Sequence, residues 1–255
     1  MDTKSLVIKP SERMAVRASQ ELKDQDVVFV GIGLPNLACN LARATHAPQL
    51  FMIYESGTIG TIPARLPVSI GDPTLVTDSL AIVSQSDIFQ SYLQGGLIEV
   101  GFLGGAQIDR YGNINTTVIG DYSNPKVRLP GSGGACEIAT HSHRVLIMMR
   151  MSPKSFVEKC DFITSPGSRF HDKTRQELGL PGGGPTRAIT DLGVLEMIDG
   201  EFTLTEIYEG VTVEKVKQSC GWDLKIAPKL KTVPEPDAKV IELLRTKIDP
   251  ENLYL

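Results

Sequence analysis

Short apolar runs separated by amphipathic segments are the feature of this sequence that most restricts its fold. Such runs are VVFV at 27–30, LFMIY at 50–54, LIEVGFL at 97–103 and RVLIMMR at 144–150. Largely apolar runs of this length are typical of strands that are buried on both faces, and the segments between them are long enough for crossover helices. The pattern therefore predicts an α/β fold with an open, mainly parallel central sheet and helices on both faces.

Capping residues and turn signals place the remaining elements. Helices are predicted at 11–22, with Ser11 as N-cap, and at 36–45 and 86–96. Further strands are predicted at 80–84 and 187–197. Two more helical segments are expected at 211–222 and 236–248, on either side of a proline-rich link. The organisation predicted is a single domain, residues 1–255, that ends in a helical tail at about 235–255.

Composition limits the class of partner. The formal net charge is −4, and Lys and Arg do not cluster, which argues against a nucleic-acid surface or an anionic membrane surface. No apolar stretch is long enough to cross a membrane, and the N-terminus lacks the apolar core of a signal peptide. We therefore expect a cytoplasmic protein that binds a small molecule or another protein.

The cysteines and histidines do not predict a metal site. The cysteines have no CxxC or other ligand spacing and are expected to be reduced, partly buried thiols: Cys39, Cys136, Cys160 and Cys220. Among the histidines only two are close in sequence, which is too few for a converging ligand set: His46, His141, His143 and His171. No GxSxG turn marks a serine nucleophile either.

A glycine turn follows the first predicted strand, at Gly31-Ile32-Gly33. A strand that feeds a glycine turn and then a helix can hold the pyrophosphate of a dinucleotide. The third glycine of that fingerprint is missing, however, because Asn36 stands in its place. A tight turn between strand and helix is the preferred interpretation, with a helix N-terminus that is still able to face an anionic ligand.

Glu55 stands at the carboxyl end of the second apolar run and is followed at once by Ser56 and Gly57. Burying a carboxylate costs several kcal/mol unless a partner compensates, and ligand sites of open α/β sheets gather at this end of the strands. Small neighbours leave room for a substrate. The position alone is equally consistent with an acid that caps a loop or pairs with Arg65.

Two glycine clusters follow apolar or turn segments, GGAQIDRYGNINTT at 104–117 and GSGGACEIA at 131–139. Glycines let backbone N–H groups approach a ligand oxygen without an intervening side chain. Donors of this kind stabilise an oxyanion. Each cluster alone is weak evidence, although the long Gly-, Asn- and Thr-rich segment that they enclose favours a loop system shaped around a ligand.

Several stretches together resemble the β subunit of the family I coenzyme A-transferases. The similar stretches are FVGIGLP (29–35), IYESGTIG (53–60), PVSIGD (67–72), the whole of 93–139, ITSPG (163–167) and ITDLGV (189–194). The resemblance covers about nine tenths of the chain. Within the family, the phrases GIGLP, YESG, YLQGG and GNINTTVIGDYSNPKVRLPG look most like subunits that act on 3-oxoadipate, and next most like those that act on glutaconate.

The resemblance implies a two-subunit enzyme in which a separate α subunit completes the activity. Its nucleophile is the glutamate of the ESG motif, which falls on Glu55. The carboxylate would attack an acyl-CoA, with succinyl-CoA as the expected donor, and form a glutamyl-CoA thioester before CoA passes to an acid such as 3-oxoadipate. Coenzyme A is thus a substrate, and neither a metal nor a permanently bound cofactor is implied.

Further site residues follow from matching motifs. The expected oxyanion donors are the backbone amides of Gly133, Gly134 and Ala135. The expected cleft for substrate and CoA consists of Gly31, Gly33, Ser56, Gly57, Gly104, Gly105, Ala106, Gln107 and Cys136. Gln107 has an equal alternative as an amide that fixes a loop. Cys136 departs from the Asn or Pro expected there, and a catalytic role for its thiol is disfavoured beside an intact Glu55.

Two other functions remain open at this point. Proteins on the same scaffold hydrolyse or decarboxylate CoA thioesters, and those are expected to lack the ESG acid, which is retained here. The wider fold also serves as a ligand-sensing domain in regulators, but neither a DNA-binding helix-turn-helix nor a basic arm is evident in this sequence.

Overall fold

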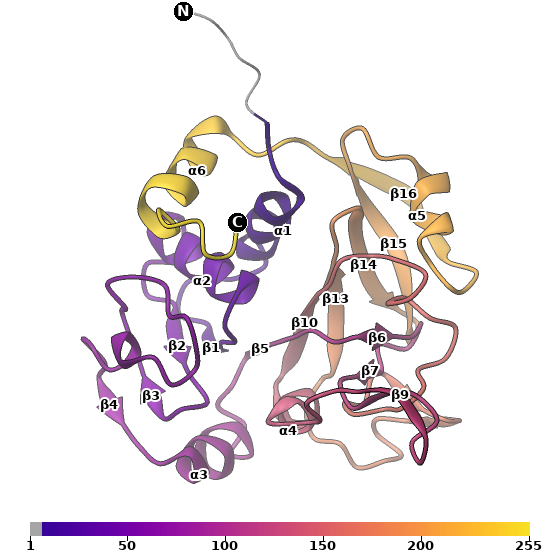
Figure 1. Cartoon of the computed structure of the whole chain (residues 1–255), viewed down its shortest axis with the longest axis horizontal. Helices are drawn as coiled ribbons and strands as arrows, with labels where there is room; N and C mark the ends of the chain where they lie inside the picture. The colour runs from indigo at the N-terminus through magenta and orange to yellow at the C-terminus, as the bar shows by residue number, and fades with distance from the viewer. Residues whose placement is uncertain (1–6) are drawn as a thin grey trace, which may run out of the picture. The chain divides into compact units, whose positions relative to one another are not determined.

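The structure is a computed structural model that describes residues 7–255 (Figure 1). The chain forms two compact units. Unit 1 comprises the chain up to residue 85 together with residues 234–255, and unit 2 comprises residues 86–233. The helix α3 (Gln85–Asp87) lies at the boundary in sequence. The C-terminal tail is therefore a component of unit 1, whose segments come from two separate parts of the chain.

The strand, glycine turn and helix predicted near the N-terminus are present in unit 1. After α1 (Pro10–Ser19), β1 (Val27–Phe29) leads into α2 (Leu34–Thr45), and β2 (Phe51–Ile53) runs parallel to β1. The chain then turns back through β3 (Thr58–Ile59) and, beyond the helical turn η1 (Pro73–Leu75), through β4 (Ala81–Ile82); both pairings are antiparallel. Residues 80–84 were predicted to form a strand, and the strand present there, β4, is shorter and exposed.

Helix α1 begins earlier than the sequence predicted. Lys9 is the N-cap and Pro10 occupies the first helical position, where its missing N–H costs nothing. The Glu12 carboxylate accepts a hydrogen bond from the Lys9 backbone N–H at 2.6 Å, which satisfies a free donor of the first turn. Ser11 is consequently not the cap, and the helix ends at Ser19 rather than at residue 22.

The C-terminal helices pack against α1 and α2. Following an Asp237 cap, α6 (Ala238–Leu243) continues into the π-helical turn η3 (Leu244–Ile248). Their apolar side chains join one buried cluster in unit 1, which contains Ala15, Val16, Leu37, Leu41, Leu66, Ile241 and Leu244. Arg245 forms an ion pair with the fully buried Glu12 at 2.5 Å. The predicted helical tail is therefore present and contributes to the core of unit 1.

Unit 2 contains a second set of paired strands. The central three are parallel: β5 (Val100–Leu103), β10 (Arg144–Met148) and β13 (Pro185–Ile189). Two antiparallel strands, β14 (Gly193–Ile198) and β15 (Glu201–Tyr208), extend the sheet, and β16 (Lys225–Val233) pairs parallel to β15. The helices are η2 (Ile88–Leu93), α4 (Ala135–His141) and α5 (Val213–Gln218).

The glycine-rich middle of the chain forms short hairpins rather than an unstructured loop. β6 (Gln107–Ile108) pairs with β7 (Ile114–Asn115), and β8 (Val118–Gly120) pairs with β9 (Pro125–Arg128). A third small hairpin joins β11 (Arg169–Phe170) to β12 (Lys173–Thr174).

The predicted α/β class is confirmed, with parallel strands at the centre and antiparallel strands added beside them. One strand prediction was wrong, because residues 187–197 belong to two antiparallel strands. The Thr190 hydroxyl accepts hydrogen bonds from the backbone N–H groups of Leu192 and Gly193, at 3.1 and 3.0 Å, and so closes a turn between β13 and β14. The predicted helix at 86–96 is shorter and ends in the π-helical turn η2.

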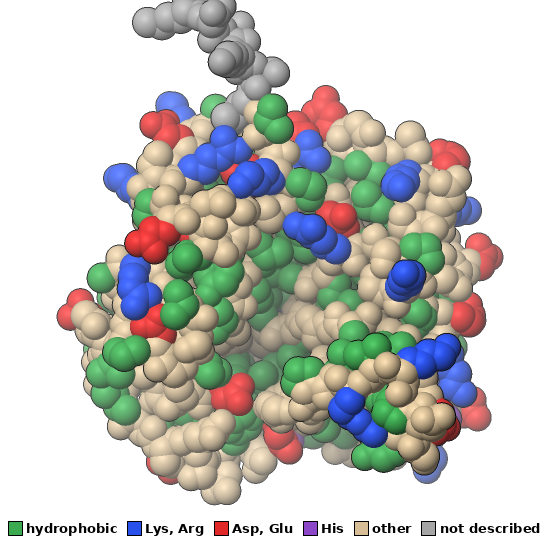
Figure 2. Space-filling view, in the orientation of Figure 1, with side chains coloured by type: hydrophobic (Ala, Val, Ile, Leu, Met, Phe, Trp, Pro, Cys, Tyr) green, Lys and Arg blue, Asp and Glu red, His purple; other side chains and the backbone are tan. Residues whose placement is uncertain are grey.

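The distribution of surface charge and the character of the helices bear on function. On the face shown in Figure 2, Lys and Arg side chains are interspersed with Asp and Glu. In the described part of the chain, residues 7–255, no helix has the length and apolar character needed to span a membrane.

Candidate active site

Glu55 lies in the tight turn that joins β2 to β3. The Gly57 N–H donates to the Tyr54 carbonyl at 3.0 Å, which closes a four-residue turn with Glu55 and Ser56 at its centre. The Tyr54 N–H in turn donates to the Thr58 carbonyl at 3.0 Å. Tyr54 is fully buried and its hydroxyl accepts a hydrogen bond from the Asn36 amide on α2 at 2.6 Å. The residue beside Glu55 is thus anchored in the core while Glu55 follows the end of a strand.

Only glycine fits at position 57. Its φ of 108° belongs to a region that side chains disfavour, and an added Cβ would meet the Val83 carbonyl oxygen at 2.1 Å. The close approach exists because the Val83 N–H donates to the Gly57 carbonyl at 2.9 Å. Gly57 was expected from the sequence to leave room for a substrate. Its lack of a side chain also lets the backbone at Val83 lie against the turn.

The Glu55 carboxyl is half-buried, and its described hydrogen-bond partner is the Gln85 amide at 3.4 Å. Burial raises the pKa of Glu55, and the hydrogen bond from Gln85 opposes this shift. A structural role for Glu55 would pair its carboxylate with Arg65. Arg65 instead binds Asp72 through two hydrogen bonds of 2.8 and 3.0 Å. The carboxylate has no charged partner among residues 7–255, and a poorly solvated carboxylate of this kind is suited to nucleophilic attack.

The Gly31–Gly33 turn lies at the same edge of the parallel pair as Glu55. Phe29 pairs with Ile53 in register, and the Val30 N–H donates to the Ile53 carbonyl at 2.9 Å, so both segments leave the sheet side by side. Gly33 has φ of 90° and forms the N-cap of α2. A Cβ at Gly31 or Gly33 would meet open space. The structure therefore brings Gly31, Gly33, Ser56, Gly57 and Glu55 together in unit 1.

The glycine loops of unit 2 enclose a cavity of about 330 Å³. Predicted cleft residues Gly105 and Ala106 line it together with Ala135, and the other lining residues are Thr116, Leu129, Pro130, Gly131 and Ser132. A Cβ at Gly105 would lie 2.3 Å from the Ile114 side chain, so glycine permits this close packing. No charged side chain lines the cavity, which suits an uncharged acyl or thioester group.

The backbone amides of the oxyanion segment are not equivalent. The Ala135 N–H donates to the Ser132 carbonyl at 2.9 Å, whereas the N–H groups of Gly133 and Gly134 have no hydrogen-bond acceptor within residues 7–255. Gly133 adopts φ of 48°, and Gly134 precedes the first turn of α4. Free, exposed or helix-terminal amides are the groups able to bind an oxyanion. Gly133 and Gly134 therefore fit the predicted role, and Ala135 serves mainly to line the cavity.

Gln107 is buried and every side-chain bond it makes is internal to unit 2. Its amide nitrogen donates to Asp161 at 3.1 Å, and its carbonyl oxygen accepts from Asn115 at 2.8 Å and from the Asp161 N–H at 3.0 Å. These are the bonds expected of an amide that fixes a loop. Gly104 lies shortly before β6, which begins at Gln107. A Cβ added at Gly104 would lie 3.1 Å from the Met148 carbonyl oxygen. Contact of Gly104 or Gln107 with a substrate stays a prediction.

Helix α4 carries Cys136 and is held at its far end by a half-buried cation, Arg175. The Cys136 N–H donates to the Ser132 hydroxyl at 3.3 Å, and burial raises the pKa of its thiol, which disfavours a reactive thiolate. Arg175 donates to the carbonyls of Ala139 and Thr140 in the last turn of α4, at 2.9 and 3.2 Å. Arg175 also donates to the carbonyls of Gly167 and Gly182, so it connects α4 to the two segments that carry these glycines.

Sequence reasoning missed several residues at these sites. Gln85 is thirty positions from its partner Glu55 in sequence, and nothing in its local pattern marks it. Gly131, Ser132 and Thr116 had a usable signal, because they lie within the glycine-rich stretches at 131–139 and 104–117. The Thr116 hydroxyl donates to the Gly131 carbonyl at 2.8 Å and so supports the cavity wall.

Comparison with known proteins shows the family to which this sequence is similar. The sequence profile of the family described as Coenzyme A transferase matches residues 11–219. The chain is 50% identical over 237 residues to the B subunit of 3-oxoadipate CoA-transferase from Pseudomonas knackmussii, covering 92% of this chain and 91% of that protein. It is 37% identical to the B subunit of glutaconate CoA-transferase from Acidaminococcus fermentans, covering 96% and 94%.

Solved structures show the same fold. The crystal structure of glutaconate coenzyme A-transferase from Acidaminococcus fermentans superposes with a TM-score of 0.89 at 36% identity, covering 97% of each chain. The decarboxylase AibA/AibB superposes with a TM-score of 0.83 at 25% identity, covering 96% of this chain and 97% of the other.

Proposed function

Because this chain belongs to the coenzyme A transferase family, we propose that it is the β subunit of a two-subunit CoA-transferase. The proposed donor is succinyl-CoA and the proposed acceptor is a 3-oxo or dicarboxylic acid such as 3-oxoadipate. The 50% identity to the B subunit of 3-oxoadipate CoA-transferase supports this choice over a glutaconate-type substrate, for which the identity is 37%. The observation that carries the proposal is Glu55, an acid without a charged partner within residues 7–255, half-buried in a turn that only glycine at 57 permits.

Glu55 is the proposed nucleophile. Its carboxylate attacks the thioester carbonyl of the acyl-CoA, and the tetrahedral intermediate expels the CoA thiolate to leave an acyl-glutamyl anhydride. The thiolate then attacks the glutamyl carbonyl, which releases the donor acid and leaves a glutamyl-CoA thioester. The acceptor carboxylate repeats both steps in reverse and regenerates Glu55. These exchanges consume no water and need neither a metal nor an oxidant.

The free amides of Gly133 and Gly134 are the proposed donors to the tetrahedral oxyanion. A donor pair of this kind contributes about 3 kcal/mol or more to transition-state stabilisation. The uncharged cavity beside them, lined by Gly105, Ala106 and Ala135, is proposed to hold the acyl or thioester group. Coenzyme A is bound as a substrate, and a cytoplasmic location is proposed because acyl-CoA substrates are found inside cells.

An α subunit is the proposed partner, since the similar relatives are named as the B subunits of their enzymes. Exposed apolar side chains of unit 1 support a partner-covered surface. Between β3 and the end of β4 the exposed fraction is 54% for Ile62, 62% for Val68, 74% for Leu80 and 59% for Ile82. Contiguous exposed apolar surface marks protein contact sites more often than apolar side chains that are scattered singly.

Trapping the covalent intermediate tests the function. The chain is co-expressed with its α subunit, incubated with succinyl-CoA and treated with borohydride, which reduces a glutamyl-CoA thioester to an alcohol. We expect irreversible loss of activity and a reduced side chain at position 55 in the peptide map. Glu55→Ala should lower transfer by about a thousandfold or more, while the exposed Glu209→Gln serves as the matched control and retains activity.

Substrate pairs and products distinguish the alternatives. Faster CoA transfer from succinyl-CoA to 3-oxoadipate than from acetyl-CoA to glutaconate is expected. The reverse order would favour the glutaconate-type alternative. Release of free CoA, or of carbon dioxide, without a new acyl-CoA would indicate the hydrolase or decarboxylase alternative. Full activity after borohydride treatment would contradict the covalent mechanism.

A further inference from the structure

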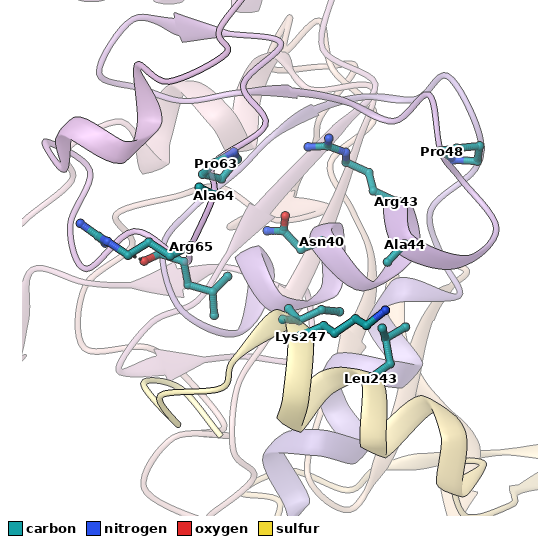
Figure 3. Close-up of a pocket in the computed structure, with 11 residues that line it drawn as sticks. Asn40, Arg43, Ala44, Pro48, Pro63, Ala64, Arg65, Leu243 and Lys247 are labelled. Carbon is teal, nitrogen blue, oxygen red and sulfur yellow. Dashed lines mark hydrogen bonds between the residues drawn. The ribbon is translucent and has the colours of Figure 1, made fainter.

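A second cavity lies in unit 1, in a region that the proposed reaction does not use. Its volume is about 310 Å³, which is within the range of pockets that bind small molecules. Figure 3 shows it between α2, the loop that carries Pro63 and Arg65, and the C-terminal helix that carries Leu243 and Lys247. Its walls therefore come from segments that are far apart in the sequence.

Two cations that line this cavity, Arg43 and Lys247, have no acidic partner in the described chain. Arg43 is half-buried and donates to the Thr61 carbonyl at 3.0 Å, but it has no acidic partner within residues 7–255. Burial lowers the pKa of its guanidinium, which is the expected consequence of a cation held without a counter-ion. The Lys247 ammonium likewise has no ion pair or hydrogen bond in the described chain. The charge of Arg65, by contrast, is matched by Asp72 at 2.8 Å.

The remaining walls are suited to an organic molecule. Asn40 and Arg43 are three residues apart on α2 and so project from the same face of the helix (Figure 3). Pro48 and Pro63 supply apolar surface beside Arg43, and Leu243 does so beside Lys247. A ligand can therefore place an anionic group near the cations and an apolar body against these residues.

We propose that this cavity is a binding site for a small organic anion, with a carboxylate or phosphate head held by Arg43 and Lys247 and an apolar body against Pro48, Pro63 and Leu243. The site is separate from Glu55 and does not depend on the proposed transferase reaction. A cationic ligand is disfavoured because it would add to the two unmatched charges.

Calorimetric titration of the assembled protein, this chain with its α subunit, tests the site. The probes are phenyl phosphate, benzoate and inorganic phosphate. We expect saturable binding of phenyl phosphate or benzoate, and weaker binding of inorganic phosphate, which lacks an apolar body. The organic probe that binds more tightly identifies the head group as phosphate or carboxylate, and either result supports the proposal.

Variants assign the binding to this cavity. Arg43→Gln and Lys247→Gln should each weaken binding of the organic probe by about tenfold or more, the effect of losing a charge-assisted hydrogen bond. Lys239→Gln, at an exposed position of α6 outside the cavity, is the matched control and should bind as the unmodified protein does. Lys247 is exposed, so its variant should fold even if Arg43→Gln does not.

Two results would overturn the proposal. One is the absence of binding to the assembled protein, including the case in which the α subunit covers the cavity. The other is unchanged binding in both Arg43→Gln and Lys247→Gln, which would place the anion elsewhere. Neither result bears on the borohydride experiment at Glu55, so failure of this site and failure of the proposed function are distinguishable.

Discussion

As the proposed nucleophile, Glu55 attacks a thioester only in its ionised form, so its surroundings set the lower pH limit of the proposed reaction. Burial raises the pKa of this carboxyl, and the hydrogen bond from Gln85 at 3.4 Å favours the ionised form. As the pH falls through the raised pKa, the nucleophile is protonated and kcat/KM declines. The acid limb of the pH profile therefore lies above the range of an ordinary, solvated glutamate.

Replacing Gln85 with leucine should move that limb to still higher pH, because the variant removes a hydrogen bond that stabilises the carboxylate. The measurement is the pH dependence of kcat/KM for the assembled enzyme. Gln176→Leu, at an exposed position in unit 2, is the matched control. A Gln85→Leu profile that coincides with that of the control would show that Gln85 does not influence Glu55.

At the scale of elements, the turn between β2 and β3 determines where Glu55 is held. Gly57→Ala would force a Cβ against the Val83 carbonyl oxygen and would strain a residue with φ of 108°. We expect the free energy of unfolding to fall by about 3 kcal/mol, with a parallel loss of activity as the turn shifts.

Urea denaturation of the purified chain measures this change. Gly71→Ala is the matched control, because a Cβ there meets no atom within 4 Å, and its effect should stay within about 0.5 kcal/mol. Equal stability of the two variants would mean that the contact between residues 57 and 83 relaxes without cost.

The elements also show what the sequence could predict. The strand, turn and helix over 27–45 were predictable, because an apolar run, Gly31, Gly33 and Pro35 all favour the same local structure. The run at 80–84 has the same apolar character but forms an exposed strand, since its burial depends on what covers it and not on its own residues. Strand β15 was missed because its polar residues interrupt the apolar pattern.

The candidate site was predictable to a similar extent. Glu55 and the glycine clusters are contiguous motifs, so their chemistry can be read locally. The distinction between Ala135, whose amide is bonded, and Gly133 and Gly134, whose amides are free within residues 7–255, depends on the turn at Ser132. The contact from Gln85 depends on the chain returning through β4. Such contacts are set by tertiary packing, which a sequence pattern does not encode.

At the scale of the whole molecule, the exposed segment around β4 should govern assembly. Leu80→Lys or Ile82→Lys would place a charge within an apolar contact and should weaken association with the α subunit by about tenfold or more. Ile198→Lys, which alters an exposed apolar residue in unit 2, is the control. Co-purification and sedimentation measure the complex, and undiminished assembly of both unit 1 variants would place the partner on another surface.

The ion pair between Arg245 of the C-terminal tail and Glu12 should contribute to the stability of unit 1. Burial alone would raise the pKa of Glu12, but the hydrogen bonds from Arg245 and the Lys9 backbone outweigh it and hold the pKa below its ordinary value. Arg245→Met removes the partner of a fully buried carboxylate and should cost about 2 kcal/mol near neutral pH. Lys239→Met, on the exposed side of the same tail, should cost little.

The pH dependence of this difference gives a second check. A depressed folded-state pKa contributes stability above the unfolded-state pKa, and that contribution is lost as the pH falls through the folded-state value. The stability difference between the unmodified chain and Arg245→Met should therefore shrink below about pH 4.5, the ordinary value for glutamate. A difference that is constant with pH would exclude the ion pair as its source.

Because unit 1 consists of two separate parts of the chain, its core can be completed only after the C-terminal residues have been made. Residues 86–233 are one continuous stretch of chain, whereas unit 1 is completed only by α6 and η3, which are translated last. The core shared by α1, α2 and the tail forms only after residues 238–248 have been translated. A chain that stops before residue 238 would thus carry Glu55, the proposed nucleophile, on a unit that lacks part of its core.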